Sequence, residues 1–253
     1  MLAAGLELGS GCGDPAHLRS TYRVSSGKAR VILHRFTQVE STQLEARKLA
    51  EAGSGHGTVV WADEQTAGRG RLGRSWTGTP GESLLFSVVL RPGGLARDAA
   101  LLSLGAAAGV AEALDVRVKW PNDLVDGQGR KLGGFLGELE LDGTGIRYVL
   151  LGLGLNVSQA AFGPELPNAT SLRLVHGEHD REDVLDRAVR AILAWSSHPD
   201  RLELWRSRAH TLGKWVKIGE REGIATALRD DGALIVGGVA VTTGEVEVVL
   251  ALG

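Results

Sequence analysis

Glycine and arginine alternate in one short segment, residues 68–76, whose residue types could bind an anion. Its sequence is GRGRLGRSW. Glycines let backbone N–H groups approach a phosphate closely, and arginines supply permanently charged, forked donors for phosphate or carboxylate. The ring of Trp76 could stack on a base. A hydrogen bond to a charged group contributes roughly 1.5–3 kcal/mol, so this segment could hold a charged nucleotide.

Other interpretations of residues 68–76 stay open at this point. The pattern G-x-G-x-x-G is typical of a Rossmann dinucleotide site, which needs a helix at the last glycine and an acidic residue about 20 positions on. Residues 74–81 do not favour a helix start, and Leu90 and Arg91 stand where the acid is needed. A solvated basic loop is the other alternative. A P-loop is excluded because no G-x-x-x-x-G-K-[ST] motif occurs.

A second segment, residues 119–123, has the sequence KWPND. Pro121 ends the preceding strand, so Asn122 and Asp123 project from a strand end. Polar side chains in such a position suit contacts to a ligand or to Mg²⁺. The alternative is a turn stabilised by an Asn or Asp side chain.

Two more segments place glycines inside strands. Residues 131–138 read KLGGFLGE and residues 152–157 read GLGLNV. Glycine weakens a strand and often marks a place where a ligand lies against the backbone. Lys131, at a strand start, could direct its ammonium group at a carboxylate or phosphate. The alternative for Lys131 is an exposed lysine after a turn.

Hydrophobic periodicity and cap residues predict the elements that position these segments. Ser41 is predicted to cap a short helix that ends at Gly53. Turns are predicted near residues 126–129 and 142–143. The predicted strands are 31–39, 58–62, 83–91, 116–120, 131–141 and 146–157, and the longer helices are 96–114, 181–197 and 201–210.

The hydrophobic pattern of the sequence changes after Leu212, where predicted short strands alternate with predicted tight turns. They predict a small β-barrel of about five strands. Residues 1–30 are rich in Gly, Ser and Ala, show no clear period and are predicted to be a loose tail. The expected organisation is therefore a tail (1–30), a main domain (31–210) and a C-terminal barrel (211–253).

The composition excludes several classes of protein. The 253 residues are 43% hydrophobic and 23% charged, with a net charge of −2, which argues against a bulk nucleic-acid binder. Cys12 is the single cysteine, so neither an intrachain disulfide nor a cysteine metal cluster is expected, and a reducing cytoplasm is the simplest setting. No signal peptide and no apolar run of membrane-spanning length is found.

Together the four segments resemble the biotin–protein ligases. The signatures of that family are a G-R-G-R-x-G-R-x-W loop, a K-W-P-N-D segment, a K-L-x-G-[IF]-L strand and a G-x-G-x-N strand, in this order. The resemblance extends over residues 31–253 and includes Ser41 and Thr42 at the first helix start. It implies an α+β fold, in which a mixed sheet flanked by helices, like the catalytic domain of class II synthetases, precedes a small SH3-like barrel.

The resemblance also implies roles for individual residues. Those that would bind biotin are Ser41, Thr42, Gln65, Gly68, Arg69, Gly70, Arg71, Lys131, Gly134 and Gly152. Those that would bind the nucleotide are Arg69, Arg71, Trp76, Asn122, Lys131 and Asn156. Those that would take part in catalysis are Lys131, Arg71 and Asp123. No metal ligand set is predicted, although Asp123 is considered as one ligand.

The implied activity is an ATP-dependent ligase with Mg²⁺ as cofactor and biotin as substrate. It would form biotinyl-5′-AMP and transfer biotin to a lysine of the biotin carboxyl carrier protein of acetyl-CoA carboxylase, in the cytoplasm. Some family members carry an N-terminal winged-helix domain that represses transcription, and residues 1–30 are too few for one. No nucleic-acid or membrane partner is therefore expected, and a homodimer is left open.

Three rival functions were considered. A lipoate–protein ligase would need an Arg-Arg-x-Ser-Gly-Gly-Gly-like loop, which is not found in the sequence. A non-enzymatic sensor of biotin or of a nucleotide would not need Lys131 and Arg71. A nucleic-acid-binding module is disfavoured by the net charge and by the missing winged helix.

Overall fold

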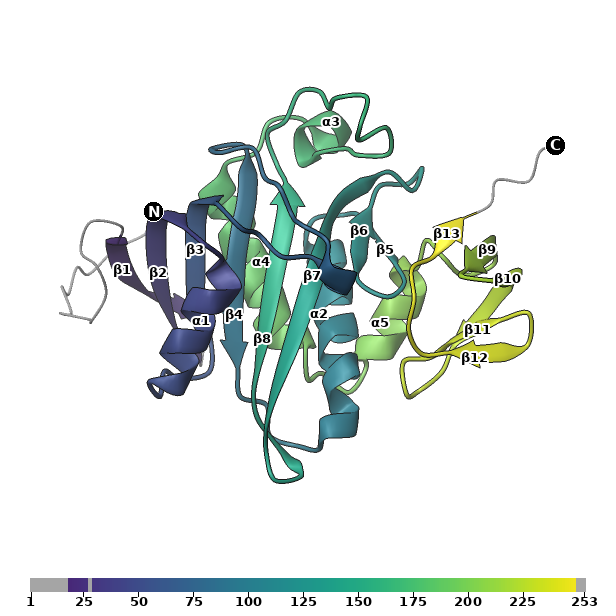
Figure 1. Ribbon diagram of the computed structural model, residues 1–253, viewed down its shortest axis with the longest axis horizontal. Helices are drawn as coiled ribbons and strands as arrows, with labels where there is room; N and C mark the ends of the chain where they lie inside the picture. The colour runs from purple at the N-terminus through teal and green to yellow at the C-terminus, as the bar shows by residue number, and fades with distance from the viewer. Residues whose placement is uncertain (1–17, 27–28, 249–253) are drawn as a thin grey trace. The chain divides into compact units, whose positions relative to one another are not determined.

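The computed structural model describes residues 18–26 and 29–248 (Figure 1). The chain forms two compact units. The first contains the described residues of Met1–Ala96 and Phe135–Ala160, and the second those of Arg97–Gly134 and Ala161–Gly253. Strand β7 begins in the second unit and continues in the first.

The first unit is built on a mixed sheet with its strands in the order β1-β2-β3-β4-β8-β7. Strands β2 and β3 run parallel because helix α1 connects them, whereas β1–β2, β3–β4 and β4–β8 are antiparallel pairs. The bounds are β1 Leu18–Ser26, β2 Ala29–Val39, α1 Thr42–Glu51, β3 Thr58–Gln65, β4 Ser83–Leu90, β7 Lys131–Asp142 and β8 Gly145–Asn156.

Helix α1 covers one face of this sheet with small side chains. Ala46 and Ala50 are fully buried and pack on Val60, Val89 and Leu150 of three neighbouring strands. Alanines let a helix approach a sheet closely. Every residue of β4 is buried, which agrees with its continuous apolar sequence, SLLFSVVL. This core fixes the start of α1 and the ends of β3 and β8, where several of the predicted site residues lie.

Strand β1 differs from the predicted loose tail. Residues 18–26 pair antiparallel with β2, from Leu18 opposite Phe36 to Ser26 opposite Ala29. Backbone hydrogen bonds to β2 hold the strand in place, so it needs no apolar period of its own and the sequence pattern did not reveal it. The rest of the predicted tail, residues 1–17 and 27–28, lies outside the described residues.

The second unit contains three longer helices that pack on one another. Gly105 and Gly109 of α2 lie directly against Trp195 at the end of α4, where a side chain on either glycine would overlap the tryptophan. Two short strands, β5 and β6, and the first residues of β7 form antiparallel pairs beside them. The bounds are α2 Ala99–Ala113, β5 Arg117–Lys119, β6 Asp123–Val125, α3 Leu172–His176, α4 Arg181–Trp195 and α5 Arg201–Arg208. Short 3₁₀ turns lie at Arg71–Gly73 in the first unit and at Ala96–Asp98, where the chain passes from the first unit to the second.

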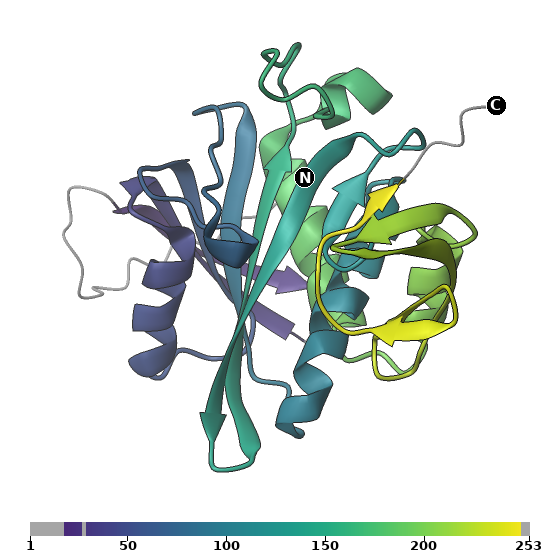
Figure 2. The same ribbon diagram turned by 45° about the vertical axis from the view of Figure 1, so that its right-hand side comes forward.

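The C-terminal strands form a five-stranded antiparallel sheet, not the predicted closed barrel (Figure 2). The order is β12-β11-β10-β9-β13, so β12 and β13 are its edges. Within the described part of the chain these edges do not pair with each other, and β13 contributes only two residues. The bounds are β9 Trp215–Ile218, β10 Arg221–Leu228, β11 Leu234–Val236, β12 Val239–Val241 and β13 Glu247–Val248.

The predicted domain boundary near residue 211 stays a prediction, and it falls inside the second compact unit. The C-terminal sheet belongs to the second unit, in which the backbone N–H of Trp120 donates to Thr211 Oγ1 and the indole N–H donates to the carbonyl of Gly232. Trp120, which follows β5, is 2% exposed, so its backbone and its buried indole both connect this part of the chain to residues 211 and 232. The predicted α+β class, with a mixed sheet and flanking helices, is confirmed.

Most predicted helices and strands are found within a few residues of their predicted ends. Helix α3 was not predicted, since it has only five residues; Ser171 caps it by accepting from the N–H of Leu174. Within the described residues, no helix combines the length and the apolar character needed to cross a membrane.

Candidate functional site

In the first unit, the start of helix α1 brings three polar side chains into the protein. Ser41 caps the helix as predicted, and its hydroxyl accepts from the N–H of Gln43. Ser41, Thr42 and Gln43 are all nearly buried, with 1%, 4% and 4% of their surface exposed. Buried polar groups need hydrogen-bond partners, so these residues are fixed in orientation.

Thr42 and Gln65 come together as the resemblance implied. The side-chain oxygen of Gln65, at the end of β3, accepts from the N–H of Thr42 at 2.7 Å and lies 3.0 Å from its hydroxyl. The Thr42 hydroxyl also lies 2.9 Å from that of Ser87, in the middle of β4. Gln65 is partly exposed, whereas Thr42 is buried, so a ligand would approach the pair from the side of Gln65.

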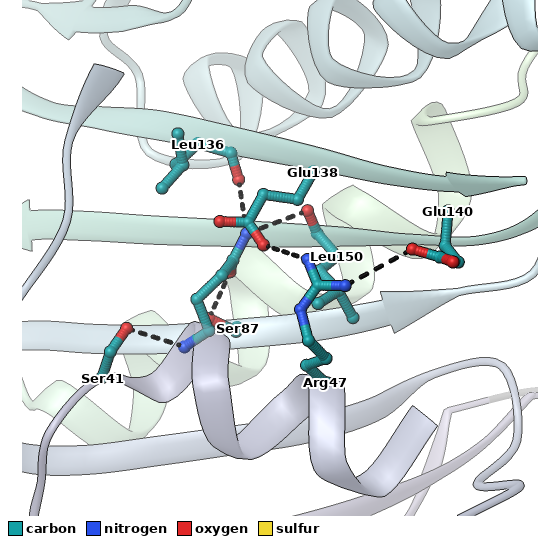
Figure 3. Close-up of polar contacts among 8 residues, drawn as sticks. Ser41, Arg47, Ser87, Leu136, Glu138, Glu140 and Leu150 are labelled. Atoms are coloured by element: carbon teal, nitrogen blue, oxygen red, sulfur yellow. Dashed lines mark hydrogen bonds and ion pairs between the residues drawn. The ribbon is translucent and has the colours of Figure 1, made fainter. Parts of the chain in front are cut away.

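Gln43 and Ser87 extend this group and were not singled out in the sequence. The amide of Gln43 donates to the carbonyls of Leu136 and Leu150, and its oxygen accepts from Ser87 at 2.8 Å (Figure 3). A signal was present in the sequence, because Ser87 is a lone hydroxyl between apolar residues of a buried strand.

The glycine- and arginine-rich loop follows β3 directly and closes on itself. The N–H of Gly70 donates to the carbonyl of Arg74, and that of Trp76 donates to Gly68. Arg71 begins a short 3₁₀ turn at the tip of this loop. Gly68 cannot be replaced without a shift, because a side chain there would overlap the carbonyl of Trp76. Of the predicted arginines, Arg69 is exposed and Arg71 half-buried.

The two glycines of β8 make room for side chains of the protein. Gly152 lies against the side-chain oxygen of Gln43, and Gly154 lies under the indole of Trp76. Both glycines are partly exposed although Leu153, which lies between them, is buried. Two contacts stay predictions: that of Gly152 with biotin and that of Trp76 with adenine. Asn156, at the end of β8, is buried and lies 3.5 Å from the amide nitrogen of Gln159.

In the second unit, Asp123 lies between two lysines. Lys131 Nζ is 2.7 Å from one carboxylate oxygen, and Lys119 Nζ is 3.4 Å from the other. The backbone of Lys131 is held on both sides, since its N–H donates to Asn168 and its carbonyl accepts from Thr170. The ammonium group of Lys131 is therefore held in place although the side chain is 41% exposed.

Gly134 and Asn122 complete this second group. Asp123 pairs with Gly134 across β6 and β7, and a side chain on Gly134 would press on the carboxylate of Asp123 and approach Lys131. The glycine thus leaves room for the ion pair. Asn122 is partly exposed in the turn between β5 and β6, after the cis peptide bond between Trp120 and Pro121.

The carboxylate of Asp123 could take part in holding Mg²⁺. This cation usually binds through one or two carboxylates together with substrate phosphates. Within the described residues, no cluster of three or more His, Cys, Asp and Glu side chains could hold a metal by itself. Asp123, which already lies between two lysines, would supply a single carboxylate to such a cation, and this role stays a prediction.

Near Asp123 and its two lysines, burial and neighbouring positive charges keep His210 neutral. Burial, together with the positive charges of Lys214 and Lys119, lowers the pKa of His210 to about 4. The ammonium group of Lys214 donates to its Nε2 at 2.8 Å, and burial also lowers the pKa of Lys214. In the first unit, the hydrogen bond to Glu138 raises the pKa of Arg47 (Figure 3).

Each unit thus contributes a distinct chemical capability. The first offers hydrogen-bonding oxygens at Thr42 and Gln65 beside a loop rich in backbone N–H groups and arginines. The second offers an accessible, positioned ammonium group on Lys131 next to a carboxylate. Such groups suit the binding of a neutral polar head group, an anion and a nucleophile.

A family profile described as "Biotin/lipoate A/B protein ligase family" matches residues 34–156. The chain is 36% identical to the biotin–[acetyl-CoA-carboxylase] ligase of Paracoccus denitrificans over 80% of this chain and 93% of that protein. The chain therefore belongs to the biotin protein ligases of this family.

A solved structure of the biotin protein ligase from Aquifex aeolicus in complex with biotin and ATP matches the fold with a TM-score of 0.70. Its sequence is 29% identical, and the match covers 85% of this chain and 97% of that one. The chain is also 34% identical to the bifunctional ligase/repressor BirA of Bacillus spizizenii over 78% of its length. It spans 66% of the length of that relative.

Proposed function

We propose that this protein activates biotin with ATP and transfers it to a lysine of a biotin carboxyl carrier protein. The observation that carries the proposal is the Thr42–Gln65 pair, followed only a few residues later by the glycine- and arginine-rich loop. The pair suits the polar ureido ring of biotin, and the loop suits its carboxylate and the phosphates of ATP. The relatives named as biotin ligases support this assignment.

The first step joins two anions. A carboxylate oxygen of biotin attacks the α-phosphorus of ATP, the bond to the β-phosphate oxygen breaks, and pyrophosphate leaves with the electron pair. Arg69, Arg71 and Lys131 are proposed to offset the repulsion between carboxylate and triphosphate and to orient the reacting atoms. Gly68 and Gly70 are proposed to let backbone N–H groups of the loop reach the same anions.

Further residues are proposed to hold the rest of the two substrates. Ser41 would hydrogen-bond the ureido ring together with the Thr42–Gln65 pair. Trp76 would flank the adenine. Gly134 and Gly152 would face biotin, and Asn122 and Asn156 would contact the nucleotide. Mg²⁺, when bound, would neutralise phosphate charge, with Asp123 as its protein ligand.

The second step transfers biotin to an amine. The acceptor lysine must lose a proton before it attacks the acyl carbon, because its free pKa is about 10.4. Its nitrogen then forms the amide bond, and AMP leaves with the electrons of the mixed anhydride. Asp123 is proposed to orient this amine or accept its proton. Its two lysine neighbours fix the carboxylate in place.

The acceptor is proposed to be the carrier subunit of acetyl-CoA carboxylase, the enzyme that the names of several relatives include. A cytoplasmic setting follows from that partner. The proposal includes no nucleic-acid or membrane partner, and leaves a homodimer as an alternative to a monomer.

The proposal is tested by ATP–pyrophosphate exchange with two substrates. Biotin is expected to support exchange, and lipoate, which has no ureido group, is not. Mass spectrometry of the quenched reaction should detect biotinyl-5′-AMP. Faster exchange with lipoate than with biotin would show that the protein belongs to the other branch of its family.

A further inference from the structure

Four side-chain oxygens of the first unit lie in a row, which we call the oxygen chain: Gln43 Oε1, Ser87 Oγ, Thr42 Oγ1 and Gln65 Oε1. The three consecutive contacts are 2.8, 2.9 and 3.0 Å long. All three are hydrogen-bond distances for O–H···O, so each needs a proton between the two oxygens to be attractive.

Both ends of the oxygen chain can only accept. The nitrogen of the Gln43 amide must face the carbonyls of Leu136 and Leu150, which accept its two protons, so its oxygen faces Ser87. At the other end, the oxygen of Gln65 faces the N–H of Thr42, which can only donate. Neither amide can turn over without breaking these bonds.

The oxygen chain has one hydrogen-bonding proton fewer than it has contacts. Ser87 and Thr42 supply one hydroxyl proton each, and no amide end supplies any, whereas there are three contacts to fill. One contact therefore always lacks a proton, and two oxygen atoms face each other there. A donor from outside these four side chains is needed to complete the row.

The missing proton belongs at the exposed end. Ser87 is 0% exposed and Gln43 4%, and an unsatisfied buried oxygen costs about 1–3 kcal/mol. The Ser87 proton therefore stays with Gln43. The Thr42 hydroxyl then has one proton for two neighbours, Gln65 and Ser87, so the shortage falls on Thr42, whose partner Gln65 is partly exposed.

We propose that Gln43 and Ser87 are positioning residues that make the Thr42–Gln65 pair an acceptor for an N–H group of the ligand. The inference rests on the proposed function and deepens it, because the ureido ring of biotin carries two N–H groups. A dithiolane ring carries none and cannot complete the oxygen chain. Two residues that need not touch the ligand would thus select the class of substrate.

Each of two substitutions should make the number of hydroxyl protons equal to the number of contacts between oxygens. In Ser87→Ala, the single remaining hydroxyl proton, from Thr42, fills the single remaining contact, with Gln65. In Gln43→Leu, the Ser87 proton is released to Thr42 and the Thr42 proton to Gln65, so two protons fill two contacts. Either variant should then need the ligand N–H less than the parent does.

The test is isothermal titration of the full chain with biotin and with two analogues, each methylated at one of the ureido nitrogens. For the parent, the analogue that lacks the selected N–H should bind at least tenfold more weakly than biotin. In Ser87→Ala and Gln43→Leu this ratio should shrink about 5- to 10-fold. Steric effects of the methyl group cancel in the comparison between variants.

Thr58→Val is the matched control, since it removes a buried hydroxyl of the same unit that donates to the carbonyl of Gly55 and lies outside the oxygen chain. It should keep the parent ratio, and thermal melting should show that all variants fold. An unchanged ratio in Ser87→Ala and Gln43→Leu would overturn the inference while leaving biotin binding intact. A parent that does not bind biotin at all would overturn the proposed function as well.

Discussion

The side chain of Lys131 is accessible to solvent, while its backbone is held in a fixed position. Its backbone is hydrogen-bonded to Asn168 and Thr170, its ammonium group lies 2.7 Å from Asp123, and its side chain is 41% exposed. Ion pairs of this exposure contribute about 0–1 kcal/mol to stability. The lysine is therefore better explained by its use toward a ligand than by its contribution to the fold.

We predict that Lys131→Ala reduces formation of the adenylate at least 100-fold, the size of effect seen when one preorganised charge-stabilising donor is lost. Single-turnover kinetics with biotin and ATP measures the rate, and thermal melting measures the fold. The melting temperature should stay close to that of the parent, because Asp123 keeps Lys119 as a partner.

Lys48→Ala is the matched control for this substitution. Lys48 is also paired with a carboxylate at 2.7 Å, that of Glu45, but lies exposed on α1. Its removal should leave adenylation unchanged. If Lys131→Ala adenylates biotin at the parent rate, Lys131 has no role in the first step.

At the scale of elements, the loop after β3 concentrates positive charge at its tip, while backbone hydrogen bonds close it. The bonds that close the loop are between backbone atoms of Gly68, Gly70, Arg74 and Trp76. The side chain of Arg71 takes no part in these backbone bonds. A substitution of Arg71 should therefore change ligand binding and leave the loop closed.

We predict that Arg71→Gly weakens retention of the adenylate more than it blocks synthesis. Loss of one charged hydrogen bond of about 1.5–3 kcal/mol would raise dissociation roughly 10- to 100-fold. The released anhydride would then react with lysines of bystander proteins. Biotin incorporation into albumin, compared at equal adenylate production, measures this effect.

Leu72→Gly separates lost charge from added flexibility. Leu72 is 70% exposed with a φ of 55°, a conformation that glycine adopts more readily than leucine. This variant should show parent levels of bystander labelling. Equal labelling by Arg71→Gly and the parent would mean that Arg71 does not retain the intermediate.

The indole of Trp76 lies directly against Gly154 of strand β8. We predict that Gly154→Ala destabilises the protein by about 1–3 kcal/mol, since the added methyl group would overlap the indole. Nucleotide affinity should fall as well if Trp76 flanks the adenine. Thermal melting and ATP titration provide the two measurements.

Gly145→Ala offers the comparison within the same strand. A methyl group there would meet its nearest neighbour, the carbonyl of Asp142, at an ordinary 3.6 Å. This variant should melt within a few degrees of the parent. A Gly154→Ala protein with parent stability and parent ATP affinity would show that Trp76 can move without consequence.

Sequence patterns predicted the elements whose periodicity is strong. The buried strand β4 and the cap of α1 at Ser41 were found because apolar runs and cap residues act locally. Strand β1 was missed because its pairing with β2, not its own sequence pattern, makes it a strand. Closure of the C-terminal sheet was predicted wrongly, because closure depends on pairing between edges far apart in sequence.

The candidate site was predicted in part for a similar reason. Motifs pointed to Lys131 and Asp123 and to Thr42 and Gln65, and the structure brings each of these pairs together. Gln43 and Ser87 were not found, because their bonds connect residues 44 positions apart. No spacing rule in a single sequence reveals such a contact.

At the scale of the whole molecule, one histidine of the second unit should influence stability against acid. His210 is 7% exposed and bonded to Lys214, and its pKa is lowered to about 4. In the unfolded chain a histidine has a pKa of about 6.5. Between these values the unfolded chain binds a proton that the folded chain does not, so stability falls as the pH falls.

We predict that the free energy of unfolding decreases from pH 6.5 toward pH 4 by more in the parent than in His210→Gln, which cannot titrate. Urea unfolding at a series of pH values measures the difference. The same slope in His210→Gln and the parent would show that another group is responsible.

Transfer of biotin to its acceptor tests the central claim most directly, since it requires recognition of biotin, use of ATP and recognition of the carrier. The full chain is incubated with biotin, ATP, Mg²⁺ and a purified biotin carboxyl carrier domain, and intact-mass spectrometry follows the carrier. We predict the gain of one biotinyl group on a single lysine, with release of AMP and pyrophosphate and no gain when that lysine is replaced by arginine. A carrier that stays unmodified while the protein is folded and binds ATP would contradict the proposed function.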